Sequence, residues 1–183
     1  MKNEKLKRLV LSAIMIALAT VLSFVKVYKL PLGGSVTLLS MLPIVVVSML
    51  YGVKQGLATA FAYSAVQMFV DLGEVVGWGL TSTALVGCIL FDYIIAFTGI
   101  GIAGIFRKKG FLGIIGGTAI ALFWRFVSHL ISGVFIFDIW CEWSSPLLYS
   151  VCYNGSFMLP ELVFTALAVA FVFKLPQMKR LIG

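Results

Sequence analysis

The feature that most constrains this chain is a succession of long apolar stretches, each bounded by polar, glycine-rich or basic residues. A helix needs about 20 apolar residues to cross about 30 Å of hydrocarbon. Six segments approach or exceed that length: Leu9–Val25, Val36–Tyr51, Gly56–Val70, Leu80–Phe106, Phe111–Phe137 and Leu147–Phe173. The sequence therefore predicts an all-α integral membrane protein with six transmembrane helices, in a single transmembrane domain over residues 1–183.

The composition excludes the main alternatives. The chain is 61% hydrophobic and 11% charged, whereas soluble domains are about 45–50% apolar and about 25% charged. With 183 residues, it has too little interior to hide this surface from water, and it is too hydrophobic to be disordered. Strand periodicity is absent, and the runs are too long for barrel strands. Pro43 and Pro160 lie within two of the spans and predict kinks there.

The basic residues predict the orientation. Eleven of them fall on one side of the expected spans: Lys2, Lys5, Lys7, Arg8, Lys54, Arg107, Lys108, Lys109, Lys174, Lys179 and Arg180. Only Lys26 and Lys29 fall on the other side. By the positive-inside rule, the richer side is cytoplasmic and holds both termini. Four acids are expected in the outer loops, namely Asp71, Glu74, Asp138 and Glu142.

The net charge of +7 is accordingly a topology signal, and no nucleic-acid partner is expected. The chain has three cysteines, and no two of them form a CxxC motif. The sequence therefore predicts neither a disulfide framework nor a zinc site. The first apolar run is longer than a signal-peptide core and lacks a small-residue cleavage site, which favours a first membrane span.

A few polar side chains fall inside the expected spans, where they are costly and usually mark a pathway or a site. These are Asp92, Arg125, His129, Asn154 and Glu161. Their depths predict a polar pocket open to the outer side and floored by an Arg125–Glu161 pair. Other interpretations stay open at this point. His129 and Asn154 can serve as interhelical hydrogen-bonding groups, the Arg125–Glu161 pair can be purely structural, and Trp140 and Trp143 can be interfacial residues.

Sequence motifs for catalysis are missing. There is no HExxH, GxSxG or Walker A motif and no metal-ligand spacing. We therefore expect no enzymatic activity, no metal and no cofactor, and no use of ATP by this chain through a Walker A loop. A carboxylate, an imidazole, an amide and several aromatic rings in one half of the membrane suit a flat, nitrogen-rich cationic ligand.

The chain resembles the S components, the substrate-binding membrane subunits of energy-coupling factor (ECF) vitamin transporters, and most closely their thiamine-specific type. The most specific blocks are RFVSHLISG at Arg125–Gly133 and LYSVCYNGSFMLPE at Leu148–Glu161. Weaker ones are the AxxxA segment Ala13–Ala17, GGSVTLLSMLPI at Gly33–Ile44, YGVKQGL at Tyr51–Leu57 and the pair Asp92-Tyr93.

The resemblance implies a six-helix S-component fold that binds thiamine near the outer face. By matching motifs, it assigns ligand binding to Asp92, Tyr93, His129, Tyr149 and Asn154. Phe137, Trp140 and Trp143 are candidates for stacking on thiamine, with the register in this loop left open. Asp92 stands where a longer glutamate can occur, and Tyr28 is the available aromatic of the first outer loop.

The same resemblance implies partners in a bacterial plasma membrane. A transmembrane coupling protein would dock on the face carrying Ala13 and Ala17, and two ATPase subunits would drive the delivery of thiamine inward. Two alternatives remain open. The ligand can be another vitamin or a thiamine precursor such as hydroxymethylpyrimidine, or the chain can be a stand-alone small membrane protein.

Overall fold

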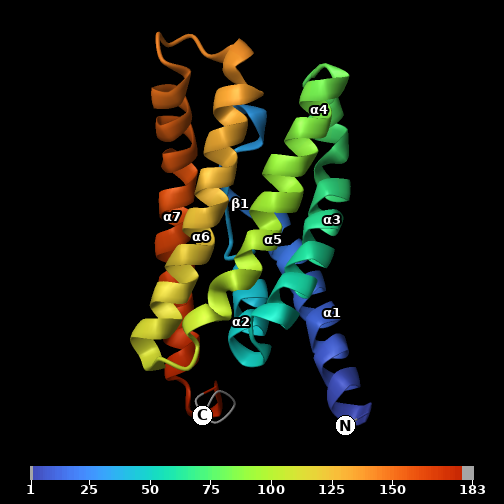
Figure 1. Cartoon of the computed structure of the whole chain (residues 1–183), viewed down its shortest axis with the longest axis vertical. Helices are drawn as coiled ribbons and strands as arrows, with labels where there is room; N and C mark the ends of the chain where they lie inside the picture. Colours follow the sequence, from blue (N-terminus) through green and yellow to red (C-terminus); the bar gives the residue numbers. More distant parts are fainter. Residues whose placement is uncertain (1, 179–183) are drawn as a thin grey trace.

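The computed structural model describes residues 2–178, which are mostly helical (Figure 1). The long helices are α1 (Lys2–Phe24), α3 (Val53–Gly77), α6 (Gly110–Phe135) and α7 (Pro146–Lys174). A further long helix is composite: it joins α4 (Ser82–Cys88), a π-helical turn η2 (Ile89–Ile95), α5 (Ala96–Gly99) and a 3₁₀ segment η3 (Ile100–Phe106). The remaining helices are α2 (Leu42–Tyr51) and the short 3₁₀ segments η1 (Pro31–Gly33) and η4 (Asp138–Trp140).

Four helices of the described region are long and apolar enough to cross a membrane. They are α1 from Asn3 onward, the composite helix, α6 and α7. The expected spans Val36–Tyr51 and Gly56–Val70 correspond to α2, which has ten residues, and to α3, which is long but less apolar. The count of six spans therefore stays a prediction.

The start of α1 and the end of α7 lie at the same end of the molecule (Figure 1). That arrangement agrees with both termini facing one side, although which side is cytoplasmic stays a prediction. The basic residues Lys179 and Arg180, which contributed to the predicted orientation, lie outside the described residues.

The all-α prediction is wrong for the first connection, which contains an antiparallel hairpin. Its strands are β1 (Lys26–Lys29) and β2 (Ser35–Thr37), and η1 forms the turn between them. The β-branched residues Val27, Val36 and Thr37 favour extended backbone, and pairing the two strands satisfies backbone groups that a lone extended segment leaves open. The helix expected from Val36 therefore begins only at Leu42.

The two prolines behave differently from each other. Pro43 occupies the first turn of α2, where no intrahelical N–H bond is lost, so the predicted kink in this span is wrong. Pro160 lies inside α7, which continues as one helix through it. At its start, α7 is capped by Ser145, whose hydroxyl accepts from the N–H of Leu148 at 3.3 Å.

The half of the molecule near the termini is tightly packed around α2. The hydroxyl of Ser48 donates to the carbonyl of Gly101 at 2.6 Å and accepts from the N–H of Gly104 at 2.8 Å. Arg107 extends across the end of α2, with Nη1 donating to the carbonyls of Met49 and Leu50 at 3.2 and 2.6 Å. This packing buries most of α2 and leaves the open space in the opposite half of the molecule, beneath the hairpin.

Candidate functional site

A cavity lies among α3, the composite helix, α6 and α7, with the hairpin along its edge. Six of the residues expected to bind the ligand line it: Asp92, Tyr93, His129, Phe137, Tyr149 and Asn154. The structure thus brings together side chains from three helices and one loop.

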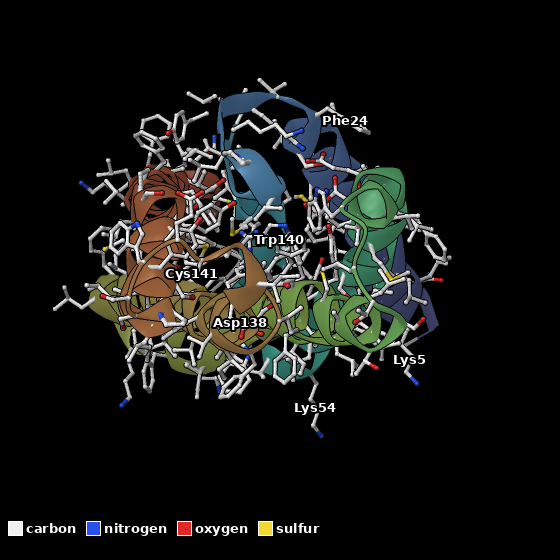
Figure 2. All side chains as sticks on the ribbon, turned by 90° about the horizontal axis from the view of Figure 1, so that it is seen from above. Lys5, Phe24, Lys54, Asp138, Trp140 and Cys141 are labelled. Atoms are coloured by element: carbon white, nitrogen blue, oxygen red, sulfur yellow. The ribbon has the colours of Figure 1, made fainter. Side chains whose placement is uncertain are left out.

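The other two stacking candidates lie beside this cavity. Trp140 and Trp143 line a separate depression together with Leu32, Glu142 and Tyr149, and Leu32 and Tyr149 border both spaces. In the end-on view, Trp140 lies over the middle of the bundle, whereas Lys5 and Lys54 lie at its rim (Figure 2). Among the aromatic residues proposed from the loop after α6, only Phe137 lines the cavity itself.

Asp92 and Tyr93 owe their placement to the π-helical turn η2. Such turns are wider than an α-helix and are frequent at functional sites. Two side chains of α6 donate hydrogen bonds to backbone carbonyls of this turn. Ser128 Oγ donates to the carbonyl of Phe91 at 2.6 Å, and Trp124 Nε1 donates to the carbonyl of Ile95 at 3.2 Å. These bonds fix the composite helix against α6, with Asp92 facing His129.

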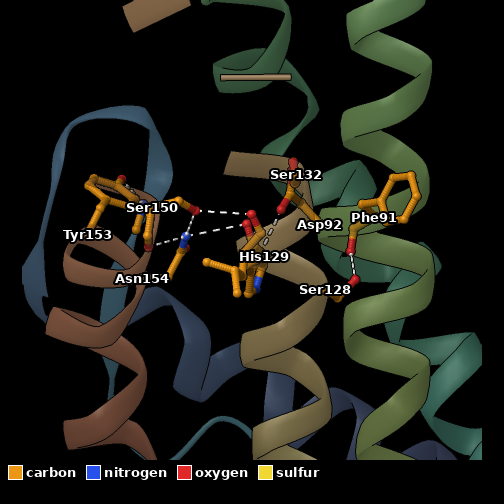
Figure 3. A network of polar contacts seen from close by, with 10 residues as sticks. Phe91, Asp92, Ser128, His129, Ser132, Ser150, Tyr153 and Asn154 are labelled. Atoms are coloured by element: carbon orange, nitrogen blue, oxygen red, sulfur yellow. Dashed lines mark hydrogen bonds and ion pairs between the residues drawn. The ribbon is translucent and has the colours of Figure 1, made fainter. Parts of the chain in front are cut away.

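Asp92, His129 and Ser132 form the polar centre of the cavity (Figure 3). His129 Nδ1 lies 2.7 Å from Asp92 Oδ1, and the hydroxyl of Ser132 donates to Asp92 Oδ2. His129 Nε2 is buried and has no hydrogen-bond partner among residues 2–178. Ser132 bonds to the carboxylate and not to the imidazole, so the three residues do not form the nucleophile–base pair of a hydrolase.

Asn154 joins α7 to α6 on the opposite wall (Figure 3). Its Nδ2 donates to the carbonyl of Ser150 at 2.9 Å, to the hydroxyl of Ser150 at 3.0 Å and to the carbonyl of His129 at 3.3 Å. The two helices can approach so closely because Gly133 faces Ser150: a β-carbon there would lie 2.2 Å from the Ser150 hydroxyl oxygen. With the amide nitrogen bonded to protein, the carbonyl oxygen of Asn154 is the group left for a ligand.

The predicted Arg125–Glu161 pair at the floor of the cavity is not formed. Arg125 and Glu161 both belong to the described region, and no ion pair joins them. Arg125, 8% exposed, donates from Nη1 to Met41 Sδ at 2.9 Å, and its guanidinium lies 4.3 Å from the ring centre of Phe97. The carboxylate of Glu161 is bonded by Thr37 instead. The predicted direct pair is therefore wrong, because the backbone of the hairpin competes successfully for the carboxylate.

The hairpin is attached to α7 at its turn as well. The hydroxyl of Tyr153 donates to the carbonyl of Pro31 and accepts from the N–H of Gly34 at 3.0 Å. A β-carbon on Gly34 would lie 2.7 Å from that hydroxyl and 3.0 Å from the ring of Phe157, so glycine is needed for this approach. Tyr153 and Phe157 also line the cavity, and neither was among the predicted site residues.

Trp78, in the connection after α3, is a further aromatic lining residue that the sequence reasoning missed. Its ring lies 5.8 Å from that of Phe137 in an edge-to-face arrangement. On the other side, Tyr149 and Tyr153 stack at 5.9 Å. Tyr153 lies four residues after Tyr149, on the same helix face, and this spacing could have identified it as a lining residue. Nothing near Trp78 in the sequence distinguished it from an interfacial residue.

Asp71 and Glu74, expected in an outer loop, belong to the last turns of α3 and line the cavity. Asp71 accepts from Gln67 Nε2 at 2.8 Å. Glu74 pairs with the hairpin lysines, at 4.0 Å from Lys26 Nζ and 3.0 Å from Lys29 Nζ. Gln67, Asp71 and Glu74 follow helical spacing, which was a readable signal for one shared face.

The site as a whole has the lining of a small-molecule binding site. No cluster of three or more metal-ligating side chains occurs within residues 2–178. The cavity offers carboxylate, imidazole and amide acceptors between aromatic walls, and it lies in the apolar half-buried setting typical of small-molecule sites. A planar ligand with N–H donors and a positive charge matches these groups.

The two docking candidates lie elsewhere. Ala13 and Ala17 are exposed on α1 and do not line the cavity. Large apolar side chains on the same helix are exposed too, among them Leu9, Ile14 and Leu18. The described structure therefore leaves this stripe of small residues uncovered.

Comparisons with known proteins bear on the family and the fold of this chain. Residues 9–180 match the Thia_YuaJ family, described as thiamine transporter protein. The thiamine transporter ThiT of Bacillus subtilis (strain 168) is 31% identical over 187 residues, covering 94% of this chain and 93% of that protein. A solved structure of ThiT from Listeria monocytogenes has the same fold, with a TM-score of 0.77, 22% identity, and 98% and 99% of the two chains covered. This chain is therefore a membrane protein that belongs to the Thia_YuaJ family of thiamine transporters.

Proposed function

We propose that this chain is the thiamine-binding S component of an ECF-type transporter. It captures the vitamin in the cavity near the outer face of the bacterial plasma membrane and delivers it inward with an ATP-driven coupling module. The observation that carries the proposal is the cavity itself, which is lined by the Asp92–His129 pair, Asn154 and a set of aromatic rings. Family membership supports thiamine as the ligand.

Thiamine consists of a flat aminopyrimidine joined to a positively charged thiazolium. In this proposal the polar wall of Asp92, His129 and Asn154, with Tyr93 beside it, binds the aminopyrimidine through hydrogen bonds. The aromatic groups at the outer edge receive the thiazolium, since aromatic faces attract cations. Phe137 and Tyr149 line the cavity directly, while Trp140 and Trp143 line the neighbouring depression.

The coupling step requires partners, because this chain carries no Walker A motif. We assign docking of the transmembrane coupling protein to the exposed face with Ala13 and Ala17, since small residues let helices approach closely. Two ATPase subunits bound to that protein would supply the energy. In this arrangement the chain crosses the membrane six times, and both termini lie in the cytoplasm.

Isothermal titration of the purified protein in detergent tests the ligand assignment. We expect saturable, one-to-one thiamine binding in the micromolar range or tighter. Competition by the separate pyrimidine and thiazole halves distinguishes thiamine from its precursors. If the pyrimidine half binds as tightly as thiamine, the ligand is a precursor; if neither thiamine nor its halves bind, the proposal is wrong. Co-purification with a coupling protein and ATPases from the source membrane tests the partner assignment.

A further inference from the structure

Two donors of α6 bond to the backbone of the composite helix at the two ends of its π-helical turn. Trp124 and Ser128 are four residues apart, so they lie on the same face of α6. Trp124 Nε1 donates to the Ile95 carbonyl at 3.2 Å, and Ser128 Oγ donates to the Phe91 carbonyl at 2.6 Å (Figure 3). The two acceptors stand on either side of the residues of this turn that line the cavity, so both ends of the lining segment are held.

A π-helical turn inside a membrane protein needs such support. Its i→i+5 pairing is rare, and where helical pairing is altered in an apolar environment, neighbouring side chains satisfy the backbone. A regular α-helix has about 3.6 residues per turn, so replacing the π turn by α-helix would rotate the two ends of the composite helix by about 100° relative to each other. Asp92 and Tyr93 would then leave their places in the cavity wall. Their direction therefore depends on donors that α6 supplies.

Trp124 supplies its donor from outside the cavity. It is 48% exposed on the surface of the helix bundle, and neither Trp124 nor Ser128 lines the cavity. The indole lies directly against the backbone of Gly99, a buried residue at the end of α5. A β-carbon on Gly99 would overlap Cδ1 and Nε1 of the indole. A glycine is therefore required here if the indole is to reach the Ile95 carbonyl.

We propose that Trp124 and Ser128 are positioning residues for ligand binding. Their bonds maintain the π-helical turn and thereby the direction in which Asp92 and Tyr93 project, although neither donor touches the ligand. The identity of the ligand rests on the proposed function, in which thiamine binds to this wall of the cavity. Affinity for thiamine thus depends on an indole at the surface of the bundle and on Gly99 beneath it.

Three variants test this dependence by titration calorimetry. Trp124→Phe and Ser128→Ala each remove one donor, and each should weaken thiamine binding about fivefold, as expected for one lost hydrogen bond. Gly99→Ala should act in the same direction as Trp124→Phe, since its methyl group displaces the indole. Wild-type affinity in both Trp124→Phe and Ser128→Ala overturns the proposal.

Two substitutions on α6 are matched controls. Phe123→Leu changes the neighbouring aromatic residue, which is exposed and lies outside the cavity. Thr118→Val removes a buried hydroxyl that bonds within α6, to the Ile114 carbonyl at 2.9 Å. Both should bind thiamine within about twofold of wild type. A loss of affinity as large as in Trp124→Phe and Ser128→Ala would assign the effect to the general packing of α6 and overturns the proposal.

The single histidine of the chain gives a second readout. His129 Nδ1 lies 2.7 Å from Asp92 Oδ1, so the NMR signals of its ring report where the carboxylate stands. In ligand-free protein labelled with ¹⁵N-histidine and purified with a histidine-free tag, Trp124→Phe and Ser128→Ala should shift these signals, and Phe123→Leu should not. Unshifted signals in both donor variants overturn the proposal. Loss of folding in Trp124→Phe also overturns it, because the bond would then act on stability alone.

The two readouts separate this proposal from the assignment of thiamine. If the wild-type protein binds no thiamine, the proposed function fails, while shifted histidine signals in the donor variants still support the positioning role. If wild type and both donor variants bind thiamine equally and the histidine signals do not move, the positioning role fails while the thiamine assignment stands.

Discussion

The carboxylate of Glu161, midway along α7, accepts hydrogen bonds from both the backbone N–H and the hydroxyl of Thr37, at 2.5 and 2.7 Å. Glu161 is 1% exposed, so a buried acid of the last helix fixes the end of the first hairpin. A buried hydrogen bond contributes about 0.5–1.5 kcal/mol, and leaving its donor unpaired costs about 1–3 kcal/mol. The contact therefore secures the edge of the cavity through residues far apart in the sequence.

Replacing Glu161 should destabilise the folded protein strongly. In Glu161→Ala the partly buried N–H and hydroxyl of Thr37 lose their acceptor, so we expect the free energy of unfolding to fall by about 3 kcal/mol. Glu161→Gln keeps an acceptor oxygen and should lose less. Thr37→Val removes only the hydroxyl bond and should cost about 1 kcal/mol. Thermal unfolding in detergent measures the series, and wild-type stability in Glu161→Ala would contradict this role.

Tyr153 should control how firmly the hairpin stays on the cavity. Its hydroxyl makes two bonds to the turn, to the Pro31 carbonyl and the Gly34 N–H. Tyr153→Phe keeps the ring and its stacking with Tyr149 but loses both bonds, which should weaken ligand binding by about 1 kcal/mol, roughly fivefold. Stopped-flow quenching of tryptophan fluorescence should assign most of this change to faster dissociation. Tyr28→Phe, on the exposed face of β1, is the control and should behave as wild type.

Asn154 and His129 should both be required for tight binding. Asn154→Ala and His129→Ala each remove a buried hydrogen-bonding group from the cavity wall, and we expect each to weaken thiamine binding by about 1–3 kcal/mol. Ser156→Ala is a matched control on α7, since its hydroxyl bonds only to the Tyr153 carbonyl and lies outside the cavity. Titration calorimetry that finds unchanged affinity in both variants would mean that the site is elsewhere.

The helical parts of the fold were predictable because apolar length is a local property of the sequence. The runs Leu80–Phe106, Phe111–Phe137 and Leu147–Phe173 match the composite helix, α6 and α7 closely. The hairpin was not predictable in the same way. Its strands are short, and what holds Thr37 is Glu161, more than a hundred residues away. Hydropathy contains no information on such a partner.

The candidate site, like the fold, was predictable from the sequence only in part. Asp92, His129 and Asn154 stand out in sequence because polar groups are rare in apolar spans, and they do line one cavity. Their mutual partners were not readable, since the choice of Thr37 over Arg125 by Glu161 depends on where the hairpin lies. Trp78 and Tyr153 were missed because aromatic residues near a membrane surface are common, and only the packing separates lining residues from interfacial ones.

The exposed small residues of α1 provide a test that separates transport from binding. Ala13→Trp and Ala17→Trp each place a large ring where we propose that a partner helix approaches closely. Thiamine uptake should therefore fall at least about tenfold in each variant. Affinity for thiamine should stay within about twofold of wild type, because neither residue lines the cavity. Ile14→Trp is the matched control: it introduces the same ring at a side chain that is already large and exposed on the same helix. Uptake by proteoliposomes or whole cells, measured beside calorimetry on the purified variants, gives both quantities. Full uptake in both Ala13→Trp and Ala17→Trp would place the partner on another face. A parallel loss of thiamine binding would point to damage to the fold of α1 rather than to docking.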